Sequence, residues 1–463
     1  MAAEAALDAS KANNTKTNGG GLKSLFTKED WWAVWIGLGV VILALILYAA
    51  GGSLNGIIVK FKAYDNFADL PGIVAGQLPK MLGLYLSMAV VFTLAIGVMG
   101  RNVGKFLAGF TLLFVMAILT QIFAAWNVAK TLNLEAPVMA LIVGMILGNF
   151  IKIPEWFDAG MRTEFYVKTG IVLFGATLPF TVILQSGPIA FLQATVVAVS
   201  TFVTIYFVAS KAFGLEKPFA ATLGAGGSIC GVSASIAIGS SVNAKKDHVS
   251  IAISMVVVWA TIMVFLLPVV CRAIGLSDGA SGALIGTSEF ADAAGIAAAA
   301  QFGDGGLATF SLMKVVGRDI FVGVWALVMA IISVTMWEAK KVDGARQKPG
   351  AGVIWERFPK FVLGFFIASI IVTLVIMASS PEMGAGINKD VLGWIKNLRG
   401  WCFVLCFLCI GLTTRFKELA AVGWKPFAAF TIGVAVNVCL GFLFSTVILN
   451  DYWTAVGAAT MAA

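Results

Sequence analysis

The stretch LGAGGSICGVSAS at residues 223–235 interrupts an otherwise apolar chain with glycines and small residues. A second stretch of this kind, GTSEFADAAG, follows at residues 286–295, and each lies just upstream of a strongly apolar helical segment. Glycine weakens a helix because it has the most backbone freedom to lose. Lipid cannot hydrogen-bond the backbone that such a break frees. We therefore expect both stretches to be packed in protein or to line a polar cavity.

The composition indicates an all-α, polytopic membrane protein. Hydrophobic residues make up 59% of the chain and charged residues 12%, whereas soluble proteins carry about 25% charged residues. The 463 residues allow roughly a dozen spans. The net charge of +8 is expected to reflect Lys and Arg in cytoplasmic loops, and no nucleic-acid partner is expected. The spacing of the six cysteines fits neither a zinc site nor a disulfide framework, so no metal is expected.

About eleven full spans are expected besides the two glycine-rich segments. They are predicted at residues 31–50, 81–99, 106–126, 136–150, 164–180, 188–213, 248–274, 307–337, 361–377, 399–412 and 424–449. With the N-terminus in the cytoplasm and both segments re-entrant, the basic loops all fall on the cytoplasmic side, as the positive-inside rule requires. Broken helices that cross each other are the alternative.

The same pattern predicts four regions. Residues 1–28 are polar and are predicted to form a disordered cytoplasmic tail. Residues 29–135 would form an extra three-span module. Residues 136–274 and 275–463 would be the two halves of a transporter core.

A weak internal repeat supports two halves. Shifting residues 175–191 by 236 positions aligns them without a gap on residues 411–427 and superposes Gly175 on Gly411. A shift of 59 superposes Gly227 on Gly286, each followed by an apolar helix. Paired interrupted segments are typical of inverted-repeat transporters, in which substrate binds near the bilayer midplane.

Residues 226–234, GGSICGVSA, resemble the Ser-Ile-Cys-Gly-Ala-Ser-Ala type of motif in the bacterial sulfate exporter family, conserved hypothetical membrane proteins of the YeiH type within the cation/proton antiporter and anion transporter superfamily. The resemblance extends from about Ala136 to the last span. It includes GIVL at 170–173, GTS at 286–288, GLTT at 411–414 and GWKP at 423–426. It implies an inverted-repeat secondary transporter. The chain departs from the family in its extra N-terminal spans, its Glu289/Asp292 pair and the spacing of Lys314 and Arg318.

Lys314 and Arg318 lie four residues apart on one face of an apolar segment. An intramembrane charge costs roughly 3 kcal/mol on insertion scales, so two of them imply a polar cavity or counter-charges. They could form the electropositive wall of an anion site, since Arg offers a fork suited to an oxyanion. Alternatively, they pair with Glu289, Asp292 or Asp319 and only hold helices together.

Glu289 and Asp292 would share one helix face. They could bind Na⁺ or carry a proton as coupling-ion residues, or they could form salt bridges with the two cations.

The backbone of the glycine-rich segments is a further candidate for binding. If each break starts a half-helix, free N–H groups at the dipole's positive end would bind an anion, and nearby hydroxyls would add donors. Close helix packing through small residues is the alternative. The candidate substrate-binding residues outside the cationic pair are Gly226, Gly227, Ser228, Ile229, Cys230, Ser233, Gly286, Thr287 and Ser288.

These observations favour a secondary transporter, expected to be an exporter, of a small anion such as sulfate, sulfite or an organosulfonate. It would work by elevator-like alternating access in a bacterial inner membrane, as a homodimer. The alternative is a Na⁺/H⁺-type cation exchanger using Glu289 and Asp292. No cofactor is expected beyond coupling to H⁺ or Na⁺.

An enzyme is not expected, because the chain has neither a Gly-x-Ser-x-Gly elbow nor a His-Glu-x-x-His motif. A non-transporting membrane subunit is a further reading, which the absence of a large soluble domain disfavours.

Overall fold

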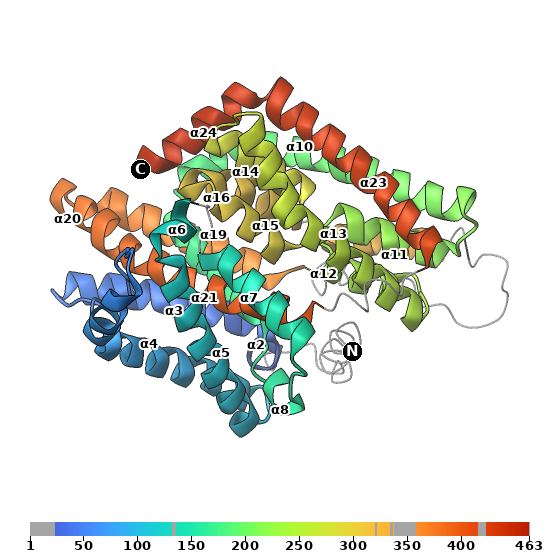
Figure 1. Cartoon of the computed structure of the whole chain (residues 1–463). Helices are drawn as coiled ribbons and strands as arrows, with labels where there is room; N and C mark the ends of the chain where they lie inside the picture. Colours follow the sequence, from blue (N-terminus) through green and yellow to red (C-terminus); the bar gives the residue numbers. More distant parts are fainter. Residues whose placement is uncertain are drawn as a thin grey trace. The chain divides into compact units, whose positions relative to one another are not determined.

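A computed structural model describes residues 24–131, 136–319, 322–333, 337, 358–414 and 423–462. These residues are helical and contain no strand, apart from one isolated bridge between Tyr64 and Trp126. Most of the region 1–28 that was predicted to be a disordered tail lies outside the described residues. The chain folds into two compact units, and Figure 1 labels most of their helices.

Unit 1 comprises residues 182–359 and 416–462 and contains both glycine-rich segments. Its helices are α10 (Phe180–Phe207, whose first two residues belong to unit 2), α11 (Lys217–Ser228), α12 (Val232–Ser241), α13 (Lys246–Ala273), α14 (Asp278–Ser288), α15 (Asp292–Ala300), α16 (Gly303–Ser311), α17 (Val322–Ile332), α23 (Trp424–Phe442) and α24 (Asn450–Ala462). Short π-helical turns continue three of these: η2 (Val208–Ala212), η3 (Leu312–Val316) and η7 (Leu443–Ile448).

Unit 2 comprises residues 17–181 and 360–415. Its helices are α2 (Ser24–Thr27), α3 (Glu29–Ala49), α4 (Leu70–Val98, preceded by the 3₁₀ turn η1, Phe67–Asp69), α5 (Val103–Ala124), α6 (Asn127–Thr131), α7 (Ala136–Phe150), α8 (Glu155–Asp158), α9 (Thr163–Thr177), α19 (Lys360–Ala378), α20 (Pro381–Gly386), the π turn η6 (Ile387–Val391) and α21 (Leu392–Thr413).

Glycines set the close packing inside unit 2. A side chain at Gly175 of α9 would overlap the carbonyl of Phe365 in α19, and one at Gly411 of α21 would overlap the carbonyl of Leu141 in α7. Small residues allow membrane helices to approach backbone to backbone, where dispersion and polar contacts replace the hydrophobic effect.

Eight of the described helices are long and apolar enough to cross a membrane, and the protein is a multi-pass membrane protein. They cover 29–49, 67–98, 103–124, 180–212, 247–273, 360–378, 381–413 and 424–448. Three of the eleven expected spans are absent from this set. Residues 136–150 and the helix Thr163–Thr177 have only 15 residues each.

The third difference is at residues 307–337, which were predicted to form one long helix. Here α16 ends at Ser311, and the π turn η3 (Leu312–Val316) follows before α17 begins at Val322. A π turn widens the helix locally and is frequent at functional sites. In this protein it carries Lys314.

Candidate functional site

The first glycine-rich segment is a helix break. Helix α11 ends at Ser228 and α12 begins at Val232. Between them Gly231 has φ 67° and ψ −115°, a conformation that residues with a side chain avoid. A Cβ at Gly231 would lie 2.9 Å from the carbonyl oxygen of Phe290. The two glycine-rich segments therefore meet at this point.

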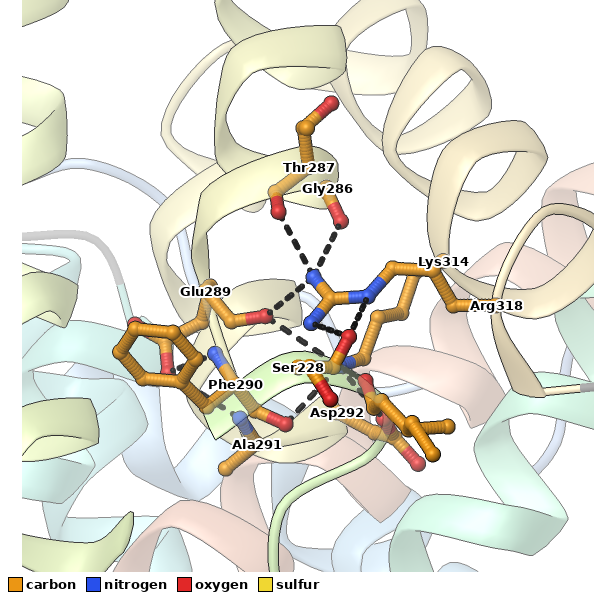
Figure 2. Close-up of polar contacts among 10 residues, drawn as sticks. Ser228, Gly286, Thr287, Glu289, Phe290, Ala291, Asp292, Lys314 and Arg318 are labelled. Carbon is orange, nitrogen blue, oxygen red and sulfur yellow. Dashed lines mark hydrogen bonds and ion pairs between the residues drawn. The ribbon is translucent and has the colours of Figure 1, made fainter. Parts of the chain in front are cut away.

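The second segment is also a break, made by extended residues rather than by a left-handed glycine. Helix α14 ends at Ser288, Glu289 and Ala291 have ψ of 134° and 129°, and α15 begins at Asp292. Both interruptions lie within the glycine-rich stretches that predicted them. Figure 2 shows the polar contacts that join the two breaks.

Lys314 is fully buried and reaches both breaks. Its Nζ donates to the carbonyl oxygens of Ile229 at 3.0 Å, Glu289 at 3.2 Å and Phe290 at 2.8 Å. An ion pair with Asp292 Oδ1 measures 3.4 Å. The ammonium group has three hydrogens, so these contacts use all of them.

Arg318 is 2% exposed and bridges the ends of α11 and α14. Its Nε and Nη2 donate to the Ser228 carbonyl at 3.1 and 2.7 Å. Its Nη1 donates to the carbonyls of Gly286 at 3.3 Å, Thr287 at 2.7 Å and Glu289 at 3.2 Å. All of these bonds are drawn in Figure 2.

The two cations therefore cap helix C-termini. The last carbonyls of a helix lack partners within the helix and carry the negative end of its dipole, so a buried cation there is stabilising. This corrects one prediction. Residues 226–228 and 286–288 do not start half-helices with free N–H groups, because they end α11 and α14 and present carbonyl oxygens. The N-terminal ends at the breaks belong to α12 and α15 instead.

Glu289 is fully buried between the two halves of the second break. Its Oε1 accepts hydrogen bonds from the backbone N–H groups of Phe290 at 2.9 Å and Ala291 at 3.2 Å. Its Oε2 is buried and has no hydrogen-bond partner among the described residues. Asp292, the first residue of α15, pairs with Lys314, as one of the two sequence-based readings expected.

The other predicted residues are distributed unevenly around these contacts between the two breaks. The Ser228 hydroxyl donates to the Gly224 carbonyl at 2.7 Å within its own helix, and Cys230 is buried. Gly226 and Gly227 are tightly packed, Gly226 against Ser235 and Gly227 against Ile205. Only Ser233 is exposed, so the structure does not place it with the buried group.

Gln193 of α10 lies at the centre of a second group of hydrogen-bonded side chains. Gln193 was not among the predicted site residues. Its Nε2 donates to Thr287 Oγ1 at 3.1 Å and to Ser445 Oγ at 2.7 Å, and its Oε1 accepts from Trp453 Nε1 at 2.9 Å. The sequence feature that could have indicated this group is a glutamine within a long apolar helix, because a buried amide requires hydrogen-bond partners. Ser288 Oγ, also buried, has no partner among the described residues.

A cavity of about 40 Å³ lies on one side of Arg318. It is lined by Thr195, Ala198, Ile229, Gly317, Arg318 and Trp325, all of which belong to unit 1. Thr195 and Trp325 were not among the sequence-based candidates.

Residues 108–430 match the family model described as conserved hypothetical protein 698. A UPF0324 membrane protein of Rhodopirellula baltica is 35% identical over 78% of this chain and 66% of its own length. One from Nitratidesulfovibrio vulgaris is 31% identical over 82% of this chain and 64% of its own length. One from Nitrosomonas europaea is 28% identical over 85% of this chain and 90% of its own length.

The chain thus spans just under two thirds of the length of the first two relatives. No solved structure matches it.

Proposed function

This chain belongs to the conserved hypothetical protein 698 family of UPF0324 membrane proteins, and on that premise we propose that it is a secondary transporter of a small anion. The observation that carries the proposal is the meeting of two interrupted helices at two buried cationic side chains, Lys314 and Arg318. Ionisable residues inside membrane proteins are costly and mark substrate or ion pathways. Interrupted helices that face one another form the central binding site in many secondary transporters.

Contacts within each unit support the proposed inverted repeat. Thr201 of α10 and Asn437 of α23 are 236 positions apart, the shift found in the sequence, and the Asn437 amide donates to the Thr201 hydroxyl at 3.0 Å. Equivalent positions meet in this way where a two-fold axis passes between repeats.

Equivalent glycines make equivalent contacts as well. Gly175 packs on the α19 backbone at Phe365, and Gly411 packs on the α7 backbone at Leu141. Gly175 and Gly411 superpose at the same shift of 236 positions, so the helices that they contact, α19 and α7, are equivalent in the two repeats. This arrangement supports the pairing of α7–α9–α10 with α19–α21–α23.

The division of helices between the units supports an elevator-like scheme. Both interrupted helices, and every contact of Lys314 and Arg318 given above, lie within unit 1. Unit 2 holds α3, α4 and α5 together with α7, α9, α19 and α21. In the proposed cycle unit 1 carries the anion and unit 2 is the scaffold.

The carbonyl contacts favour an anion over Na⁺ as the cargo. A sodium ion at a helix break is coordinated by the unwound carbonyls and by half-helix C-termini. Here those oxygens, at Ser228, Ile229, Thr287 and Phe290, already bind an ammonium or a guanidinium group. The positive dipole ends of α12 and α15 lie at the same two breaks, and that of α15 already carries Asp292.

A cation exchanger is the second candidate, and Glu289 is the observation that favours it. Its buried Oε2, which lacks a described partner, could carry a proton or bind a cation. If the protein is a cation exchanger, Glu289→Gln abolishes transport whichever ions are supplied, and Lys314 is dispensable for transport. If the protein transports an anion and Glu289 only carries a coupling proton, Glu289→Gln still permits anion exchange.

We further propose that the protein resides in a bacterial inner membrane with a cytoplasmic N-terminus, because the positive-inside rule favours that orientation. Export of the substrate and a homodimeric state are proposals that extend the sequence-based expectation.

The experiment that tests the function is ligand-dependent stability of the purified protein. Sulfate, sulfite, thiosulfate, taurine, bicarbonate and small carboxylates are each added with and without Na⁺. A ligand that binds only the folded state raises its stability by RT ln(1 + [L]/Kd). Stabilisation by an anion without Na⁺ supports the proposal. Stabilisation by Na⁺ alone would instead select the cation exchanger.

A further inference from the structure

Two residues that line the small cavity, Arg318 and Thr195, have incomplete hydrogen-bonding capacity. The first group is the Arg318 guanidinium. Its five hydrogen bonds all go to backbone carbonyls. Nε supplies one hydrogen, Nη1 shares two hydrogens among three carbonyls, and Nη2 uses one hydrogen on Ser228. One Nη2 hydrogen therefore has no acceptor among the described residues.

The second group is the Thr195 hydroxyl. Its Oγ1 is buried and has no hydrogen-bond partner among the described residues. Threonines in helices normally donate to the carbonyl four residues earlier, as Thr201 and Thr204 of the same helix do at 2.7 and 2.8 Å. Leaving a buried hydroxyl unmatched costs about 1–3 kcal/mol. The Thr195 hydroxyl is therefore able to donate a hydrogen bond to a bound ligand.

The remaining lining is apolar. Ala198, Ile229 and Trp325 line the cavity beside these donors, and the Trp325 ring packs on Phe202 with ring centroids 4.9 Å apart. Apolar walls lower the local dielectric and strengthen the attraction between a guanidinium and an anion.

We propose that this cavity is the anion-binding site, and that its ligand is a small inorganic oxyanion rather than an organosulfonate. The inference rests on the proposed function and narrows its substrate class. A volume of about 40 Å³ would hold roughly three water molecules, a size that suits bicarbonate, sulfite or sulfate. An added aliphatic chain would have to extend beyond this volume. The free guanidinium N–H and the Thr195 hydroxyl donate to two of the anion's oxygens.

Lys314 has a different role in this scheme. Its hydrogens are bound to the carbonyls of Ile229, Glu289 and Phe290, and it does not line the cavity. It holds the two breaks together so that Arg318 keeps its position. The anion contacts Arg318 and not Lys314.

The test fills the cavity without touching a charge. Ala198→Leu places three more carbons in the cavity, whereas Ala435→Leu makes the same change at an exposed position of α23. Thr195→Val removes only the hydroxyl, and Thr204→Val is its control on the same helix. Thermal stability of each purified variant is measured with sulfate, sulfite, bicarbonate and taurine. The ligand-free melting temperature verifies folding.

The proposal expects the wild type to be stabilised by at least one inorganic oxyanion and not by taurine. Thr195→Val should weaken that binding roughly 10- to 100-fold, as expected for one hydrogen bond to a charged ligand. Ala198→Leu should abolish the stabilisation, and both controls should keep it.

Two results would overturn the inference while leaving the proposed function standing: an oxyanion shift that Ala198→Leu and Thr195→Val both retain, or a taurine shift as large as that of sulfate. If no anion stabilises the wild type and none is transported, the inference and the proposed function both fail.

Discussion

Replacing Lys314 by methionine tests whether this side chain holds the two broken helices together. Methionine keeps most of the aliphatic volume and removes the ammonium group. The variant loses three hydrogen bonds to the carbonyls of Ile229, Glu289 and Phe290 and the ion pair with Asp292. Because Lys314 is fully buried, water does not replace these contacts in the folded protein.

The expected loss is about 3–5 kcal/mol in the free energy of unfolding. That is the usual cost of removing one member of a buried ion pair and leaving the other charge uncompensated. Three desolvated carbonyls at about 1–3 kcal/mol each would give a larger sum, but such costs are not additive for neighbouring groups. The double variant Lys314→Met/Asp292→Asn should recover part of the loss, about 0.5–3 kcal/mol.

The assay is equilibrium unfolding in detergent, followed by tryptophan fluorescence. Lys217→Met is the matched control, because Lys217 is exposed at the start of α11 and should change stability by no more than about 0.5 kcal/mol. A Lys314→Met loss below about 1 kcal/mol would refute the reasoning, because the carbonyls would then have other partners.

Three further predictions concern the packing of unit 1 and are measured by the same unfolding assay. Gly231→Ala should cost about 3 kcal/mol or more, because φ of 67° strains alanine and its Cβ would lie 2.8 Å from Val256. Gly214 has the same φ, but an added Cβ there would meet no atom within 4 Å, so Gly214→Ala should cost only about 1 kcal/mol. If Gly231→Ala and Gly214→Ala lost the same stability, the contact between the breaks would be disproved. Gln193→Met should cost about 2–4 kcal/mol, since buried partners lose their amide; a neutral result would contradict the network. A double-mutant cycle between Thr201→Val and Asn437→Leu should give a coupling energy of about 0.6 kcal/mol, and a zero coupling would remove this support for the repeat.

The sequence predicted the helix breaks well because glycine acts locally. The dense glycine of residues 223–235 and the polar cluster of residues 286–295 marked both interruptions to within a few residues. The sequence also named Asp292 as one of three possible acidic partners of the two cations, since a buried cation requires a counter-charge, and Asp292 pairs with Lys314.

The direction of the half-helices could not be predicted in the same way. A glycine-rich stretch can end one helix or begin the next, and only the backbone shows that Ser228 and Ser288 are last residues. That difference reverses the sign of the dipole that the segment presents. It makes Lys314 and Arg318 caps of helix C-termini, with one Nη2 hydrogen of Arg318 left over for a ligand.

Long-range contacts explain the remaining differences. The π turn that places Lys314 depends on tertiary packing, and the apolar run 307–337 gave no signal for it. Thr195 and Trp325 became candidates only because the fold places them around one cavity with Arg318. Their own sequence contexts are those of ordinary apolar helices.

The measurement that tests the central claim most directly is anion flux into proteoliposomes that contain the purified protein. Radiolabelled sulfate, sulfite and bicarbonate are each supplied to liposomes with wild-type protein, Ala198→Leu, Ala435→Leu or no protein. We expect one of these anions to enter well above the protein-free rate with the wild type and Ala435→Leu, and to enter at the protein-free rate with Ala198→Leu. Wild-type flux of Na⁺ without flux of any anion would contradict the account.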